Sequence, residues 1–286
     1  MAFLEGKVAV VTGSTRGFGL ALVQAFVREG AAVVVSSRSA GAVEKVVDAL
    51  RLQGIRISGQ TCDVTDLAQV EALAVHAVRA FGGFDVWVNN AGNEAPYGPT
   101  VHQVPERFTQ VTQTNILGAY YGSLVAMRHF LAHGRGKLIN ILGRGERGPL
   151  PMQNAYGASK AWLKNFTLAL AKEYQTSGVG IYTFSPGMMD TDMLLDVEVV
   201  AGFEDRLKIF GKVVQTLSQP PEIPARKAVW LASSASDGKT GLLVRELNPL
   251  KMLALSLRLL GRTRQPLPVK IRSVPAAYPE NDDQTA

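Results

Sequence analysis

Short apolar segments alternate with helix-length segments along most of this chain, and this alternation constrains the fold more than any other feature. Several apolar segments are hydrophobic at consecutive positions, as in strands that are buried on both faces. We expect strands at residues 8–12, 32–36, 57–61, 86–89, 137–141 and 180–184. The segments between them predict helices over residues 18–28, 42–53, 67–81, 105–132, 155–176 and 224–233. This succession predicts an α/β fold with a doubly wound parallel sheet and ligands at the carboxyl ends of its strands.

The composition fits one domain of this class. The 286 residues are 47% hydrophobic and 19% charged, enough apolar material for a substantial core and too little charge for disorder. The single cysteine, Cys62, excludes an internal disulfide and a multi-cysteine metal site, and we expect no bound metal. The N-terminus does not resemble a signal peptide, and no stretch reaches the roughly 20 apolar residues of a membrane span. We therefore expect a cytoplasmic protein.

Basic residues gather near the C-terminus. Residues 245–272 hold seven Lys and Arg against Glu246 alone, which accounts for the whole net charge of +6. Aromatic residues do not interleave with these cations, so we expect no nucleic-acid partner. The Leu-rich residues 249–262 predict an amphipathic helix. It could act as a lid over an apolar substrate, pack between subunits, or contact a membrane peripherally.

The first expected strand runs into a glycine-rich turn, TGSTRGFG, that contains Gly13, Gly17 and Gly19. Glycines between a strand and a helix let the backbone approach a pyrophosphate at the helix N-terminus. The turn favours nucleotide binding over a purely structural turn.

Two arginines suggest which nucleotide is bound. An acidic residue at the end of the second strand would accept hydrogen bonds from an adenosine ribose and repel a 2′-phosphate. This chain has Ser37 and Arg38 there instead. Arg16 lies in the glycine turn. Guanidinium groups bind phosphate well, so this set favours NADP(H), the alternative being two solvated arginines.

Tyr156 and Lys160 stand four residues apart in AYGASK. That spacing places both on one helical face, roughly 6 Å apart at Cβ. A lysine ammonium near a phenol favours the phenolate, so we expect Lys160 to lower the pKa of Tyr156 for proton transfer near neutral pH.

Six motifs in order resemble those of the short-chain dehydrogenase/reductase family, over about residues 5–245. They are TGSTRGFG, CDV at residues 62–64, NNAG at residues 89–92, Asn115, YGASK and SPG at residues 185–187. The resemblance implies a Rossmann-type domain over residues 1–245, followed by the basic Leu-rich extension at 246–272 and a disordered tail at 273–286.

The resemblance also implies the roles of the site residues. Tyr156 would be the acid/base, Lys160 would bind the nicotinamide ribose, and Asn115 would hold a water in a proton relay. The cofactor would be held by Gly13, Ser14, Thr15, Arg16, Gly17, Phe18, Gly19, Ser37, Arg38, Asp63, Val64, Asn90, Ala91, Gly92, Tyr156, Lys160, Pro186, Gly187 and Thr191.

The chain departs from the family pattern at the active-site serine. Thirteen residues before Tyr156, where the serine would bind the substrate carbonyl, stands Gly143. Losing such a donor costs about 3 kcal/mol if nothing replaces it. A substitute could come from Arg144, from a backbone N–H of the GRG turn, or from the substrate.

The plant chlorophyll(ide) b reductases, a branch of this family, resemble the chain further. They share the TGSTRG turn, lack the serine, and carry a pattern like SPGMMDTDMLL before an apolar basic extension. We expect an NADPH-dependent oxidoreductase that reduces a carbonyl or formyl group on a small apolar substrate such as a chlorophyll(ide) b-like chlorin. The alternatives are a generic 3-oxoacyl or ketone reductase and a weakly catalytic NADP-binding scaffold. We expect the substrate to contact residues 143–148, residues 188–195 and the C-terminal helix. We also expect a homo-oligomer, either a dimer or a tetramer.

Overall fold

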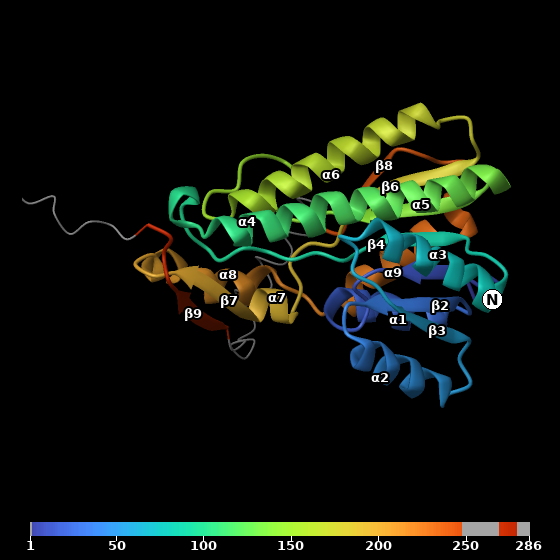
Figure 1. The fold of residues 1–286 in the computed structure, drawn as a ribbon, viewed down its shortest axis with the longest axis horizontal. Helices are drawn as coiled ribbons and strands as arrows, with labels where there is room; N and C mark the ends of the chain where they lie inside the picture. The colour runs from blue at the N-terminus through green and yellow to red at the C-terminus, as the bar shows by residue number, and fades with distance from the viewer. Residues whose placement is uncertain (1, 248–268, 279–286) are drawn as a thin grey trace, which may run out of the picture.

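The computed structural model describes residues 2–247 and 269–278 and confirms the predicted doubly wound parallel sheet (Figure 1). Seven parallel strands lie in the order β3-β2-β1-β4-β5-β6-β8. Their bounds are β1 Val8–Val11, β2 Ala32–Ser37, β3 Ile57–Thr61, β4 Val86–Asn89, β5 Gly136–Ile141, β6 Val179–Ser185 and β8 Leu242–Arg245. The strand order reverses between β1 and β4, which opens a ligand crevice at their carboxyl ends.

Helices cover both faces of this sheet, as Figure 1 shows. One face carries α1 (Gly17–Arg28), α2 (Ala40–Arg51) and α9 (Glu222–Ala232). The other carries α3 (Leu67–Phe81), α5 (Gly118–His133) and α6 (Asn154–Glu173). The shorter elements are α4 Pro105–Thr112, α7 Asp192–Leu195, α8 Phe210–Leu217 and 3-10 turns at Thr100–His102, Glu204–Leu207 and Ser234–Ser236.

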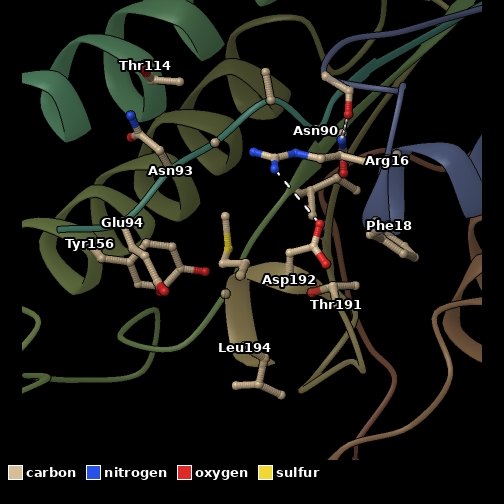
Figure 2. Close-up of a pocket in the computed structure, with 18 of the residues that line it drawn as sticks. Arg16, Phe18, Asn90, Asn93, Glu94, Thr114, Tyr156, Thr191, Asp192 and Leu194 are labelled. Atoms are coloured by element: carbon tan, nitrogen blue, oxygen red, sulfur yellow. Dashed lines mark hydrogen bonds and ion pairs between the residues drawn. The ribbon is translucent and has the colours of Figure 1, made fainter. Parts of the chain in front are cut away.

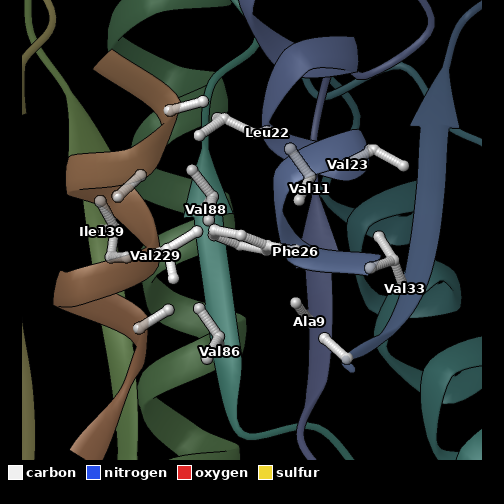
Figure 3. Close-up of a cluster of buried hydrophobic side chains, with 14 of the residues drawn as sticks. Ala9, Val11, Leu22, Val23, Phe26, Val33, Val86, Val88, Ile139 and Val229 are labelled. Atoms are coloured by element: carbon white, nitrogen blue, oxygen red, sulfur yellow. The ribbon is translucent and has the colours of Figure 1, made fainter. Parts of the chain in front are cut away.

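The core on the α1 side illustrates why the apolar runs form central strands. Phe26 of α1 is fully buried and lies between the strands and Val229 of α9 (Figure 3). Val11 and Val88, from neighbouring strands β1 and β4, face the same cluster. Full burial of a side chain the size of Phe26 contributes roughly 1.5–3 kcal/mol, so this packing holds the strand ends that form the crevice.

All six predicted strands are present, and their ends differ from prediction by one residue at most. The predicted helix over residues 105–132 is wrong as a single element. It is interrupted by a π-helix at Gln113–Leu117, which separates α4 from α5. Local side-chain periodicity does not distinguish one widened turn from a regular helix, although such turns are frequent at functional sites.

A second, two-stranded sheet lies beside the carboxyl edge of the main sheet and pairs β7 (Asp196–Val200) with β9 (Lys270–Val274). Val197 and Val199 are buried against Phe210 of α8. The tail expected from residue 273 therefore begins inside β9, and the boundary at 272 does not separate two structural units. The predicted helix at residues 249–262 lies outside the described residues. Among the described residues, no helix has the length and apolarity to cross a bilayer.

Candidate active site

A cavity of about 550 Å³ opens at the carboxyl ends of the central strands. The predicted cofactor residues that line it are Gly13, Thr15, Arg16, Gly17, Phe18, Gly19, Ser37, Arg38, Asp63, Val64, Asn90, Ala91, Gly92, Tyr156, Lys160, Pro186, Gly187 and Thr191. Ser14 does not. Its buried hydroxyl donates to the Val11 carbonyl at 2.7 Å and accepts from the Ser36 N–H at 3.0 Å, which ties the glycine turn to β2.

The glycine turn forms a backbone cradle at one end of this cavity. Gly13 has a φ of 62°, a conformation that favours glycine. A Cβ on Gly19 would lie 2.3 Å from the Gly13 carbonyl oxygen, so only glycine allows helix α1 to begin this close to β1. The Asn90 amide donates to the carbonyls of Thr12 and Gly13, both at 3.0 Å. The cradle fits a dinucleotide pyrophosphate at the N-terminus of α1.

Charged side chains surround the cradle. Arg38 follows β2, lines the cavity and is exposed. This position suits a residue that would bind the 2′-phosphate of a dinucleotide. Arg16 points across the cavity instead, and its guanidinium lies 3.9 Å from the Asp192 carboxylate (Figure 2). Both partners are largely exposed, so this ion pair contributes little and leaves Arg16 able to turn to a phosphate.

Tyr156 lies in the first turn of α6 and Lys160 in the second, and both line the cavity. The Lys160 ammonium is buried and donates to the Ile141 carbonyl at 3.0 Å, while it lies 5.6 Å from the centre of the Tyr156 ring. Helical spacing thus places the two side chains on one face, as predicted, and the end of β5 anchors the lysine.

The expected direction of the Tyr156 pKa is wrong for this structure. Burial raises the pKa of Tyr156 above its ordinary value, and the neighbouring Glu94 carboxyl raises it further. Burial also lowers the pKa of Lys160, to about 8. Desolvation disfavours the charged form of each group and sets the direction for both, so the phenol is neutral and able to donate its proton.

Asn115 lies in the π-helix and is almost fully buried behind Tyr156. Its amide donates to the Asn93 carbonyl at 2.9 Å and to the Ser159 hydroxyl at 3.1 Å, and its carbonyl accepts from the Asn93 N–H at 2.9 Å. The side chain joins the segment after β4 to α6 and does not itself line the cavity.

Gly143 begins the loop after β5 and lines the cavity. A Cβ at this position would lie 2.1 Å from the Tyr156 hydroxyl oxygen. The tyrosine hydroxyl therefore occupies the space that a serine side chain would need, and Gly143 is linked sterically to the position of Tyr156.

The loop after Gly143 divides into two parts. Arg144 lines the cavity and donates to the Tyr97 hydroxyl and, at 2.8 Å, to the Gln153 side-chain carbonyl. Glu146 turns into the protein, where it accepts from Arg245 at 2.8 and 3.0 Å. Of the three charged residues in this loop, Arg144, Glu146 and Arg147, only Arg144 lines the cavity, and substrate contact by residues 143–148 stays a prediction.

Sequence reasoning missed several charged residues at the substrate end of the cavity. Glu198 pairs with Arg107 and lies 3.6 Å from Arg272, which also binds Asp196 at 2.8 Å. Glu94 lines the same end and accepts a hydrogen bond from the Gln153 amide at 3.1 Å. A charged residue two positions after the NNAG motif was a usable signal for Glu94. The others come together only through the β7–β9 pairing, which no local pattern indicates.

Methionine and leucine side chains supply the apolar wall of this end. Met188, Met189, Met193 and Leu194 line the cavity from the loop after β6 and from α7, whereas Leu195 does not; substrate contact by residues 188–195 stays a prediction. Met193 is 41% exposed, so its flexible side chain is available to an incoming ligand.

Comparisons with known proteins agree with this geometry. The model of the short chain dehydrogenase family matches residues 7–198. The chain is 36% identical to 3beta-hydroxysteroid dehydrogenase 1 of Eggerthella lenta over 241 residues, 83% of this chain and 91% of that protein. The crystal structure of 3-ketoacyl-(acyl-carrier-protein) reductase from Brucella melitensis complexed with NADH superimposes with a TM-score of 0.76 and 27% identity. That alignment covers 85% of this chain and 97% of the other.

Two plant proteins from Arabidopsis thaliana are similar as well. The chain is 34% identical to chlorophyll(ide) b reductase NOL, chloroplastic, over 77% of this chain and 63% of that protein. It is also 34% identical to probable chlorophyll(ide) b reductase NYC1, chloroplastic, over 65% of this chain and 41% of that protein. The alignments thus span less than two thirds of either plant relative. The cradle, the Tyr156–Lys160 pair and the family match over residues 7–198 lead to one conclusion: this chain belongs to the short-chain dehydrogenase family.

Proposed function

We propose that this protein uses NADPH to reduce a carbonyl or formyl group on a small apolar substrate. The observation that carries the proposal is the Tyr156–Lys160 pair in a cavity whose other end is the glycine cradle. A bound nicotinamide dinucleotide would supply the hydride. Tyr156 gives its proton to the carbonyl oxygen, and Lys160, fixed on the Ile141 carbonyl, stabilises the charge left on the tyrosine.

NADPH is preferred because of the charges at the adenosine side. Ser37 and Arg38 line the cavity where a carboxylate would disfavour a 2′-phosphate, and Arg16 is free to rotate from its exposed contact with Asp192. Asp63 and Val64, at the end of β3, would flank the adenine. Thr191 lies at the start of α7, where a Cβ on Gly17 would be 3.5 Å from its methyl group, and would face the nicotinamide amide.

A formyl-bearing chlorin is the first substrate candidate. Two plant relatives are named chlorophyll(ide) b reductases, and the methionine-rich wall of the cavity would accept a large apolar ring. A ketone or 3-oxoacyl substrate is the second candidate, favoured by the names of the bacterial relative and of the similar crystal structure. A scaffold that binds NADP(H) without turnover is the alternative outside enzyme chemistry.

Replacing Tyr156 by Phe tests the mechanism. Y156F should reduce turnover at least about 100-fold while NADPH binding is unchanged, because only the transferable proton is removed. The measurement is NADPH oxidation with a panel of aldehydes, ketones and a formyl chlorin, alongside a fluorescence titration of NADPH. Tyr120→Phe, on the exposed side of α5, is the matched control and should behave as wild type.

Two results would contradict the proposal. Unchanged turnover in Y156F would exclude Tyr156 as the proton donor. A wild-type protein that binds NADPH but oxidises it with no member of the panel would favour the scaffold. Cytoplasmic location, homo-oligomeric assembly and membrane contact through residues 249–262 stay predictions.

A further inference from the structure

Glu94 is a carboxyl group at the reaction centre for which the mechanism has no role so far. It follows β4, lines the same cavity as Tyr156, and lies near enough for its charge to raise the pKa of that tyrosine; Figure 2 draws both residues at one end of the cavity. The neighbouring carboxylates Asp196 and Glu198 pair with Arg272. Glu94 accepts instead from a neutral amide, the Gln153 side chain at 3.1 Å. The position is therefore able to hold an uncharged acid.

The groups that face Glu94 determine its protonation. Burial is the largest influence and raises the pKa of Glu94 to about 7, and Glu198 acts in the same direction. The hydrogen bond from Gln153 and the charge of Arg144 oppose it. Tyr97 and Tyr156 complete the surroundings, and each has its own pKa raised by the proximity of Glu94. Near neutral pH a large fraction of Glu94 thus carries an O–H.

The reaction benefits from such a donor because Gly143 has no side chain that could supply one. A Cβ at Gly143 would lie 2.1 Å from the Tyr156 hydroxyl oxygen, so this backbone has no room for the serine side chain. The Nη2 group of Arg144 donates to the Tyr97 hydroxyl and the Gln153 carbonyl oxygen, and these bonds orient the guanidinium toward those two residues. Glu94 lines the same cavity as Tyr156 and Gly143, and its carboxyl group interacts electrostatically with Tyr156.

We propose that Glu94, as a neutral carboxylic acid beside Tyr156, donates a hydrogen bond to the substrate carbonyl oxygen in place of the missing serine. This inference rests on the proposed carbonyl reduction. The hydride adds to the carbonyl carbon, the carbonyl π electrons move to oxygen, and that oxygen takes the Tyr156 phenolic proton. Glu94 keeps its own proton and stabilises the negative charge that develops on the oxygen. A neutral acid in an apolar site can act in this way.

The sign of the pH dependence follows from this role. Below about pH 7, Glu94 is protonated and donates. As the pH rises through that value it ionises, the donor is lost, and a negative charge faces the developing alkoxide. Reduction should therefore slow as the pH rises through about 7. In Glu94→Gln the decrease of the reduction rate with rising pH should shift to higher pH, toward the pKa of Lys160, which is about 8.

Two substitutions separate this role from a structural one. Glu94→Ala removes the donor and should lower kcat roughly 100-fold, as loss of an oxyanion donor does. Glu94→Gln keeps an N–H donor in a side chain of similar shape that does not titrate. Its kcat should therefore stay within about tenfold of wild type, and the decrease of its reduction rate should begin at higher pH. Glu222→Gln, an exposed glutamate in the first turn of α9, is the matched control and should change neither quantity.

The inference is overturned if Glu94→Ala keeps kcat within about threefold of wild type, or if the reduction rate of Glu94→Gln decreases over the same pH range as that of wild type. Infrared difference spectra between pH 5 and pH 9 give a readout that needs no turnover. Wild type should show a neutral carboxylic acid that persists near pH 6 and is missing in Glu94→Gln. An ionised Glu94 at pH 6 would sink the inference even in a protein with no measurable turnover, whereas a wild type inactive on every carbonyl tested contradicts only the proposed function.

Discussion

At the nucleotide end of the cavity, Gly13–Gly19 and Asn90 form a cradle of main-chain groups held by two amide hydrogen bonds of 3.0 Å. At the substrate end, side chains from separate segments form two groups. Gln153 is hydrogen-bonded to Arg144 and Glu94, and Arg272 is ion-paired with Glu198. The first arrangement depends on main-chain groups, which a side-chain substitution does not remove, and on glycines that leave no room for a side chain. The second depends on side chains whose exchange alters polarity and protonation without altering the sheet. The comparison indicates that cofactor binding and substrate choice can vary independently in this protein.

The largest expected effect tests the cradle. Gly19→Ala introduces a Cβ 2.3 Å from the Gly13 carbonyl oxygen and 2.5 Å from the Asn90 amide nitrogen. Overpacking of this kind costs about 1–3 kcal/mol, and at its upper end it would weaken NADPH binding roughly 100-fold. Calorimetric titration with NADPH measures the change. Gly41→Ala is the control, because Gly41 is an exposed position of α2 where the added Cβ would have nothing within 4 Å; this variant should bind NADPH as wild type does. Wild-type affinity in Gly19→Ala would show that the cradle is not rigid.

The next effect tests the substrate end at the position of the absent serine. Gly143→Ser places a Cβ 2.1 Å from the Tyr156 hydroxyl oxygen, so the tyrosine must move. A displacement costing about 2 kcal/mol would reduce kcat roughly 30-fold and leave NADPH affinity unchanged. Steady-state kinetics should be compared with Gly148→Ser, in the same loop, where the added Cβ meets nothing within 4 Å. Higher activity in Gly143→Ser would contradict this prediction. It would mean that the added hydroxyl group helps the reaction and that Tyr156 tolerates the added side chain.

The smallest effect concerns the choice between the two dinucleotides. Arg38→Asp removes a cation from the adenosine side of the cavity and adds an anion that repels a 2′-phosphate. A charge-assisted hydrogen bond contributes about 1.5–3 kcal/mol, so NADPH should weaken at least about tenfold more than NADH. Titrations with both dinucleotides measure the ratio, and Arg51→Asp, at the end of α2, is the control. Equal losses for the two dinucleotides would contradict the assignment of NADPH.

The predictable part of the site is the part encoded by neighbouring residues. The six strands, the glycine turn and the Tyr156–Lys160 pair could be read from short windows because strand burial, turn conformation and helical spacing are local properties. The Tyr156 pKa could not, because its direction depends on burial and on Glu94, 62 positions away in the sequence. The π-helix that interrupts residues 105–132 was missed for a related reason: one extra residue in a turn leaves the apolar pattern almost unchanged.

The sequence by itself determined the parallel sheet, the crevice at its carboxyl edge and the Tyr156–Lys160 pair on one face of α6. Only the tertiary structure decided what surrounds Gly143, where the family resemblance predicts a serine. It sets the Tyr156 hydroxyl in the space above Gly143, brings Glu94 beside that tyrosine, and pairs β7 with β9 so that Arg272 reaches Glu198. These contacts join residues that are far apart in the chain. They form only when the sheet closes and the side chains compete for the same small volume, which no local pattern of residues records.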